Sequence, residues 1–119
     1  MRISELSAKA QVSVHRLRRY EADGLIESQR LPNGYRDYEE RTVRHVIFIA
    51  MSREMGFSLP FIAEYLTRFK AGKLSAQDMI EAILARVAEI DQLISEQQAL
   101  RQKLMDHIGW FKTQARRKK

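Results

Sequence analysis

Residues 1–26 read MRISELSAKAQVSVHRLRRYEADGLI, and this stretch decides the fold of the first part of the chain. Apolar residues recur in its first half at helical spacing, at Ile3, Leu6 and Ala10. Ser4 is positioned to cap that first helix. A second helix is predicted to begin after Ser13, whose hydroxyl suits an N-cap, and to end at Gly24. Two short helices joined by a turn of three to four residues form a helix-turn-helix unit.

A hairpin follows the second helix. Residues 27–31 and 35–38 flank Pro32-Asn-Gly34. Asn-Gly is the strongest two-residue hairpin signal, because both central positions of a type I′ turn need positive φ. A basic hairpin directly after a helix-turn-helix unit is a wing, so the sequence predicts a winged helix-turn-helix.

Two further helices are predicted before residue 73. The first runs from Glu39 to about Met55, and its apolar stripe is Val43, Val46, Ile47, Ala50 and Met51. The second begins after Ser58 as N-cap, tolerates Pro60 in its first turn and stops at residues 71–73. Its predicted buried face is Phe61, Ile62, Tyr65, Leu66 and Phe69.

A long helix is predicted next. Ser75-Ala-Gln-Asp78 has the form of a capping box, and no proline or glycine interrupts the chain from there to Ile108. Such a helix is about 50 Å long. Its apolar residues step by three and four as in a two-stranded coiled coil, and a lone helix cannot bury that seam. The sequence therefore predicts a homodimer through residues 75–111, with the candidate dimerisation residues Ile80, Ile83, Val87, Ile90, Ile94, Leu100 and Leu104.

Composition limits the possible functions. The chain has 119 residues, enough for one domain with an appended segment. It has no cysteine, which excludes disulfides, thiolate zinc sites, iron–sulfur clusters and a cysteine nucleophile. The longest apolar run, residues 46–51, is too short to span a membrane, and the first residues lack a signal-peptide core. We therefore expect an intracellular protein with no membrane partner.

The net charge of +6 favours a polyanionic partner, but its distribution weakens that inference. Residues 112–119 carry five of the basic groups and no acidic one, so the remainder of the chain has a net charge of only +1. We expect these residues to form a basic tail that either solubilises the protein or adds non-specific attraction to phosphate. The local arrangement of charge must therefore support any nucleic-acid function.

Taken together, these residues resemble the MerR family of bacterial transcription regulators. The matching stretches are residues 3–6, 12–14, 17–21, 24–26, 33–38 and 55–59, in the order and at the spacing of the family. The resemblance implies a winged helix-turn-helix over residues 1–70 and a dimer held by antiparallel long helices. It also implies an inverted-repeat site in promoters whose two recognition elements lie too far apart. Family members distort that spacer so that RNA polymerase engages both elements, and without effector they often repress.

The chain departs from the family pattern at three positions. Gln11 stands in the helix-turn-helix joint where the family usually has glycine, so we expect a left-handed backbone at or beside it. Arg19 replaces the first residue of a typical tyrosine pair. Glu39 replaces a better helix cap after the second wing strand.

The candidate DNA-binding residues fall into two groups. His15, Arg16 and Arg19 share the exposed side of the second predicted helix, which the physical interpretation places in the major groove; the alternative is a solvated polar face. The resemblance gives Arg18 and Tyr20, and Tyr35 and Arg36 in the wing, phosphate contacts, although Tyr20 is also suited to the core. The full candidate set is Ser13, His15, Arg16, Arg18, Arg19, Tyr20, Arg30, Tyr35 and Arg36.

Ligand and metal sites are poorly supported. Phe57, Tyr65, Phe69, Trp110 and Phe111 are better explained as core or dimer packing than as an aromatic pocket. The three histidines have no metal-ligand spacing, and we expect no cofactor. An effector held by thiolates is excluded, which leaves a small ligand at the dimer interface, a protein partner or no effector.

The leading hypothesis is a sequence-specific regulator of transcription that binds double-stranded DNA in the cytoplasm, with the nucleoid. The alternatives are an architectural, excisionase-like DNA-binding protein and a coiled-coil adaptor. Selectivity for one inverted repeat distinguishes the first from the others. An enzyme is not expected, because the sequence has no glycine-rich phosphate loop and no nucleophile with a base.

Overall fold

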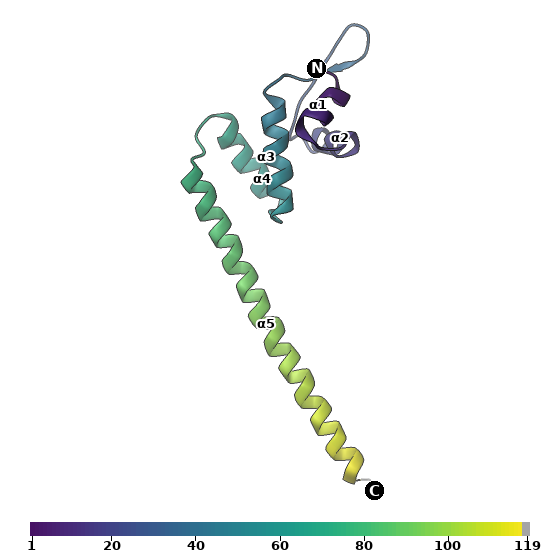
Figure 1. Cartoon of the computed structure of the whole chain (residues 1–119), viewed down its shortest axis with the longest axis vertical. Helices are drawn as coiled ribbons and strands as arrows, with labels where there is room; N and C mark the ends of the chain where they lie inside the picture. Colours follow the sequence, from purple (N-terminus) through teal and green to yellow (C-terminus); the bar gives the residue numbers. More distant parts are fainter. Residues whose placement is uncertain (118–119) are drawn as a thin grey trace. The chain divides into compact units, whose positions relative to one another are not determined.

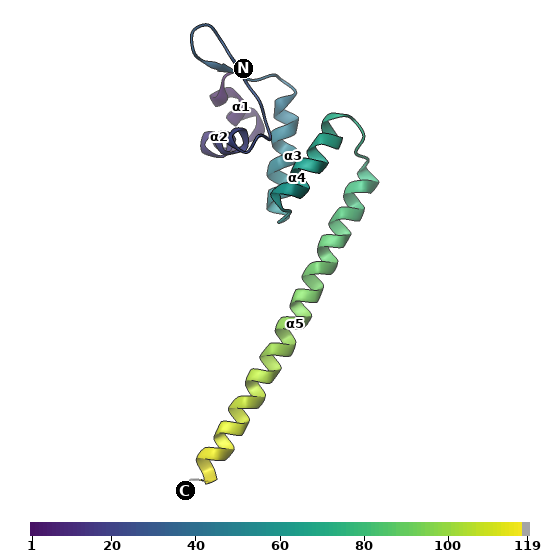
Figure 2. The same ribbon diagram turned by 180° about the vertical axis from the view of Figure 1, so that it is seen from behind.

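The computed structural model describes residues 1–117 as two compact units, divided after Ser75. The first unit holds four helices and a two-stranded antiparallel sheet, and the second is one long helix. Figures 1 and 2 show the first unit from opposite sides, with α3 and α4 packed together and the hairpin beyond α1. The predicted fold class, mainly helical with a hairpin wing and a long helix, is confirmed.

The helix-turn-helix unit consists of α1 (Ile3–Ala10) and α2 (Val14–Ala22). Ser13 caps α2 as predicted, since its hydroxyl oxygen accepts from the Arg16 N–H at 3.2 Å. The expected cap at Ser4 is wrong. The helix already begins at Ile3, so Ser4 lies inside its first turn and the N-cap position is Arg2, which makes no side-chain cap bond.

The turn between α1 and α2 depends on one backbone conformation. Gln11 has φ 56° and ψ 42°, which confirms the predicted left-handed position. Among the described residues it is the only non-glycine with positive φ. Its N–H donates to the carbonyl of Ser7, and the Ser7 hydroxyl donates to the carbonyl of Val12 at 2.6 Å. These bonds hold a conformation that glycine would adopt freely.

The wing pairs β1 (Gln29–Arg30) with β2 (Arg36–Asp37). The expected two-residue type I′ turn is wrong, because Asn33 does not have positive φ. Instead, the Leu31 N–H donates to the carbonyl of Tyr35 at 2.8 Å and the Gly34 N–H to the carbonyl of Leu31 at 2.9 Å. This is a three-residue loop closed by a left-handed Gly34. Pro32 explains it, since its fixed φ suits the second position of an ordinary β-turn.

The helix α3 spans Thr42–Glu54 and so begins three residues later than expected at Glu39. Val46 is buried as predicted, but Ile47 and Met51 are 45% and 47% exposed. Phe48 and Ile49 are buried in their place. The buried face is wider than a single stripe and rotated from it, because α3 packs against both α1 and α4.

The helix α4 spans Leu59–Lys70, and the Ser58 hydroxyl caps it by accepting from the Phe61 N–H at 3.3 Å. Ile62 and Leu66 are buried, and Phe69 stacks on Phe48 with ring centroids 4.8 Å apart. Phe61 stacks on both Phe57 and Tyr65, with ring centroids 4.1 and 4.0 Å apart. The core residues with almost no exposure are Leu6, Leu17, Ile26, Tyr38, Val46, Ile49, Ile62 and Ser52.

The second unit is α5, which spans Ala76–Arg117 over 42 residues and buries none of them. It passes through Gly109, so residues 112–117, expected as a tail, continue the helix. Residues 118 and 119 of that expected tail lie outside the described range. Within residues 1–117, no helix combines the length and the apolar character that crossing a membrane requires.

We expect Gln11→Gly to stabilise the first unit slightly, because a non-glycine residue in the left-handed region costs on the order of 1 kcal/mol. The added freedom of glycine in the unfolded chain offsets part of that gain. Denaturant unfolding followed by circular dichroism measures the difference. Gln11→Ala, which keeps a Cβ, is the control and should give no gain. A clear fall in stability of Gln11→Gly would contradict the strain.

Candidate nucleic-acid interface

The exposed side of α2 carries the predicted base-reading residues around a shallow hollow, which we call the recognition-helix hollow. Its volume is about 210 Å³, and its lining is His15, Arg16, Arg19, Tyr20, Asp23, Arg53 and Leu59. Arg19 is 76% exposed, and its only ion pair within residues 1–117 is a 3.8 Å contact with Asp23. Such an exposed pair contributes little to stability, so the guanidinium is available to another partner.

Arg53 was missed by sequence reasoning. It lies in the last turn of α3, more than thirty residues from α2 in the sequence, yet lines the same hollow as Arg16 and Arg19. No local sequence pattern identifies Arg53 as a binding residue, because the spacing of apolar residues in α3 indicates only which side faces the core and which faces solvent. Packing of α3 in the first unit brings it there, and it adds a third guanidinium to this surface.

Tyr20 is 5% exposed, so its ring belongs to the core, which was the alternative role considered for it. Its hydroxyl is buried and has no hydrogen-bond partner within residues 1–117. The side chain nevertheless forms part of the wall of the recognition-helix hollow. The geometry therefore combines a packed ring with an unsatisfied polar tip.

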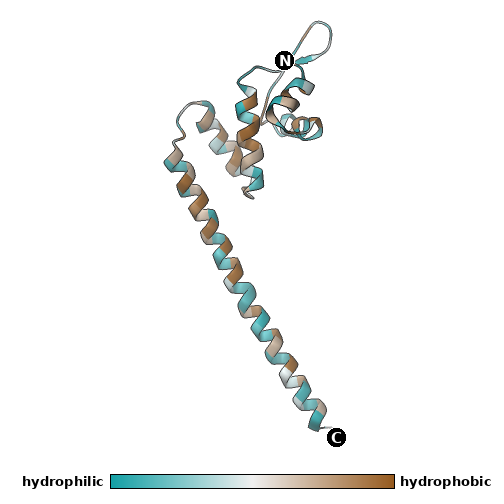
Figure 3. Cartoon of the chain, viewed as in Figure 1, coloured by the Kyte–Doolittle hydropathy of each residue, from teal (hydrophilic) through white to brown (hydrophobic). Residues whose placement is uncertain are grey.

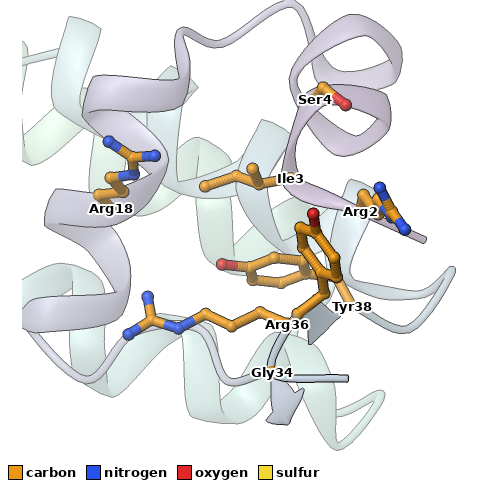
Figure 4. A pocket seen from close by; sticks show the side chains of 8 residues that line it. Arg2, Ile3, Ser4, Arg18, Gly34, Arg36 and Tyr38 are labelled. Atoms are coloured by element: carbon orange, nitrogen blue, oxygen red, sulfur yellow. The ribbon is translucent and has the colours of Figure 1, made fainter. Parts of the chain in front are cut away.

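A second hollow, the wing hollow, lies between α1, α2 and the hairpin and has a volume of about 400 Å³. Figure 4 shows Arg18 from α2 and Arg36 from β2 on the same side of it. Both residues were predicted to contact phosphate, and the fold brings them together. The complete lining is Arg2, Ile3, Ser4, Arg18, Gly34, Tyr35, Arg36 and Tyr38.

Arg2 is a further basic residue that sequence reasoning missed. Its guanidinium carbon lies 4.1 Å from the centroid of the Tyr35 ring, a cation–π contact. Tyr35 is 54% exposed and is held against the start of α1 by this contact. The sequence shows Arg2 as a basic residue just before the first helix. The residues next to Arg2 in the sequence do not indicate that its partner lies in the hairpin.

The carboxylate of Glu21 connects α2 to the wing. It accepts hydrogen bonds from the Tyr38 hydroxyl and, at 2.9 Å, from the Ser28 hydroxyl. Arg36 lies 3.6 Å from the same carboxylate. Burial of Tyr38, followed by its contact with Glu21, raises the pKa of the phenol, so it stays protonated and donates at neutral pH. Tyr38 packs under the wing and is 1% exposed.

The strands of the wing place two like charges opposite each other. Arg30 pairs directly with Arg36 in the antiparallel register. Like charges in directly opposed positions destabilise a hairpin. Arg30 lines neither hollow and is exposed, whereas Arg36 reaches the wing hollow. The Glu21 carboxylate, 3.6 Å from the Arg36 guanidinium, offsets part of this repulsion.

The remaining candidates lie outside these hollows. Ser13 is exposed at the start of α2, where its hydroxyl already serves as the cap. His45, on α3, packs edge-on against the Phe69 ring of α4, with ring centroids 6.2 Å apart. Burial, followed by the charges of Lys70, Arg41 and Arg44, lowers its pKa. Residues 1–117 contain no group of three or more side chains arranged to hold a metal ion.

Comparison with known proteins identifies the family. The sequence pattern of the MerR HTH family regulatory protein matches residues 1–68, and the pattern described as MerR, DNA binding matches residues 43–107. The chain belongs to the MerR family. The predicted resemblance is confirmed, and with it the role of the chain as a DNA-binding regulator of transcription.

Several relatives cover most of the chain. The HTH-type transcriptional regulator CueR of Salmonella typhimurium is 31% identical over 106 residues, which are 88% of this chain and 77% of CueR. The mercuric resistance operon regulatory protein of Bacillus cereus is 33% identical over 106 residues, 88% of this chain and 80% of that protein. These MerR relatives are regulators, not enzymes.

Two solved structures are similar to the fold. The regulator PbrR691 of Ralstonia metallidurans CH34, solved with lead(II), has a TM-score of 0.70 at 30% identity and covers 89% of this chain and 83% of its own. HiNmlR, a MerR family regulator lacking the sensor domain and solved with promoter DNA, has a TM-score of 0.59 and covers 82% of this chain and 75% of its own. At 17% identity, the second likeness concerns the fold alone.

We expect Arg18→Ala and Arg36→Ala each to weaken binding to all DNA sequences alike, because phosphate contacts carry no direct sequence information. Each should flatten the slope of log K against log salt by about 1 for every phosphate that is no longer bound, or about 2 per dimer. Binding isotherms at several salt concentrations measure the slope. Arg44→Ala is the matched control, since Arg44 lies over the Phe69 ring and lines neither hollow. An unchanged slope would show that Arg18 and Arg36 do not contact the DNA phosphates.

Proposed function

We propose that this MerR protein binds an inverted-repeat promoter site as a homodimer, with one winged helix-turn-helix unit on each half-site. The observation that supports the proposal most strongly is the pair of basic hollows on either side of α2. One contains Arg16, Arg19 and Arg53, and the other contains Arg18 and Arg36. A recognition helix in the major groove reads base edges with one group of side chains, while neighbouring basic residues bind the phosphates that border the groove.

The two hollows have different roles in this proposal. The residues on the exposed face of α2, His15, Arg16 and Arg19, read base edges, because arginine grips guanine with two parallel hydrogen bonds. The wing hollow holds the DNA backbone through Arg18, Arg36 and the ring-stacked Arg2. Arg30 adds charge on the opposite strand, and Tyr35 offers an exposed hydroxyl. Ser13, exposed at the start of α2, adds a hydrogen bond to a phosphate, whereas the buried Tyr20 ring supports the helix that carries these residues.

The regulatory step is the finer part of the proposal. In this proposal, binding distorts the overlong spacer between the two promoter elements. Transcription is activated when the distortion lets RNA polymerase engage both elements, and it is repressed when the distortion does not. The activity takes place in the cytoplasm, on the nucleoid. Because the chain has no cysteine, thiolate-bound metal is not proposed as its effector, although relatives are named for mercury resistance or were solved with lead(II).

Arg19→Ala tests base reading directly. Loss of a bidentate base contact should cost about 1–3 kcal/mol per half-site and relax one symmetric position of the operator. Selection of DNA from a random pool by wild type and variant gives the operator and the changed position together. Arg19→Lys keeps the charge but not the forked donors, so it should lose the same preference.

The outcomes of this selection separate the alternatives. Uniform weakening with unchanged base preferences would assign Arg19 to a phosphate. No change in affinity or preference would remove Arg19 from the interface. Failure of the wild type to select any inverted repeat would favour an architectural DNA-binding protein over a site-specific regulator.

The dimer is tested separately. We expect Ile83→Glu/Ile90→Glu to sediment as a monomer in analytical ultracentrifugation, because it places charges in the α5 seam. Ala85→Glu/Gln92→Glu adds the same charges about 200° around the helix and is the matched control, expected to remain a dimer. A seam variant that sediments as the wild-type dimer would show that the copies associate elsewhere.

A further inference from the structure

The recognition-helix hollow contains one carboxylate among its basic residues. Asp23 lies at the C-terminal end of α2 and lines the hollow together with Arg16, Arg19 and Arg53. Figure 3 shows hydrophilic positions interspersed with hydrophobic ones along α2, the helix that carries Arg16 and Arg19. Within the part of the chain that the structure describes, no other acidic residue lines either this hollow or the wing hollow. Asp23 is therefore an exception on a surface that is otherwise basic.

The position of this carboxylate favours neither the stability of α2 nor affinity for DNA. Asp23 follows the last turn of α2, where the negative end of the helix dipole disfavours an acidic side chain. The base that it contacts lies four residues earlier, which is the less favourable order for an ion pair on a helix. On a surface proposed to bind phosphates, a carboxylate also reduces the net attraction. What the carboxylate does supply is a contact with a neighbouring side chain.

That neighbouring side chain is Arg19. A carboxylate oxygen of Asp23 lies 3.8 Å from the Nε atom of the Arg19 guanidinium. Arginine presents five N–H donors in a planar fork, and a contact at the Nε edge leaves both terminal nitrogens free. Those two nitrogens can donate together to O6 and N7 of one guanine. The side chain of Arg19 is 76% exposed and that of Asp23 is 29% exposed, so the carboxylate is the more fixed member of the pair.

We propose that Asp23 is a positioning residue that determines specificity, because it directs the Arg19 fork toward guanine and keeps it from the DNA phosphates. The inference rests on the proposed function. The carboxylate attracts the guanidinium at Nε and repels a phosphate that approaches from the same side, whereas a base edge has no net charge and meets no such repulsion. Without this neighbour, Arg19 binds either a base or a phosphate. The same guanidinium then adds affinity for DNA in general and discriminates less between sequences.

Asp23→Asn tests this role, because it removes the charge but keeps the size of the side chain. It also keeps the backbone hydrogen bond from the N–H of residue 23 to the Arg19 carbonyl, at 2.9 Å. Glu27→Gln is the matched control, since it removes the same charge from an exposed residue that lines neither hollow. Full-length wild type, both variants, Arg19→Ala and the double variant D23N/R19A are compared by selection of DNA from a random pool. Binding isotherms at several salt concentrations give the salt slope, and circular dichroism checks that each variant is folded.

We expect Asp23→Asn to lower the base preference about two- to fivefold per half-site, the factor that an exposed ion pair can supply. The change should fall at the same symmetric operator position that Arg19→Ala relaxes. The released guanidinium should bind a phosphate, which steepens the slope of log K against log salt by about 1 per subunit. In the double variant, Asp23→Asn should have no further effect on base preference beyond that of Arg19→Ala. Glu27→Gln should keep the wild-type base preference.

Equal effects of Asp23→Asn and Glu27→Gln on base preference, including no effect of either, would overturn the positioning role. A change at a different operator position, or one that persists in the double variant, would also overturn it, because Asp23 would then contact a base itself. Wild-type base preference in Arg19→Ala would show that Arg19 reads no base, and Asp23 would then have nothing to direct. Failure of the wild type to select any inverted repeat is a distinct result, which contradicts the proposed function itself.

Discussion

The carboxylate of Glu21 is the point on which the geometry of the proposed DNA-binding surface depends. It lies on α2 and binds Tyr38, Ser28 and Arg36, all of which belong to the hairpin segment. A hairpin with two-residue strands has almost no stability of its own, so its position comes from what it contacts. Through Glu21 and the buried Tyr38 ring, the wing becomes an extension of the recognition helix. The amino group of Met1 adds a second connection, since it donates to the Asp37 carboxylate and to the carbonyl of Tyr38, each at 2.8 Å.

The first unit shows which features local sequence determines and which it does not. The caps at Ser13 and Ser58 and the left-handed Gln11 follow from chemistry within a few residues, and they were predicted. The buried side of α3 was predicted only in part, since it depends on two neighbouring helices at once. The predicted type I′ turn was wrong, because Pro32 precedes the Asn-Gly pair and favours a three-residue loop over the two-residue turn that Asn-Gly alone would form. Arg53 reaches the proposed DNA-binding surface through tertiary packing, which no spacing rule detects.

The two units differ in how they are stabilised. The first has a core of its own, in which residues from all four helices and the hairpin segment are buried. The long helix buries no residue, and isolated helices in water gain most of their stability from packing of an apolar face. Order in the second unit is therefore coupled to association with another chain. For a regulator of this kind, the coupling ties the presence of two DNA-binding units to the folding of the element that joins them.

The side chains proposed to read bases make few contacts with the rest of the protein, and this has a consequence for how the protein evolves. Arg16 and Arg19 are exposed, and the one ion pair of Arg19 within residues 1–117 is the 3.8 Å contact with Asp23. The nearby Leu17, in contrast, is fully buried. Substitution at the arginines therefore leaves the core intact, and under the proposed function it changes only the DNA sequence that is recognised. A gene duplicate is free to acquire a new target site through these positions, while the same helix keeps the scaffold folded through its other face.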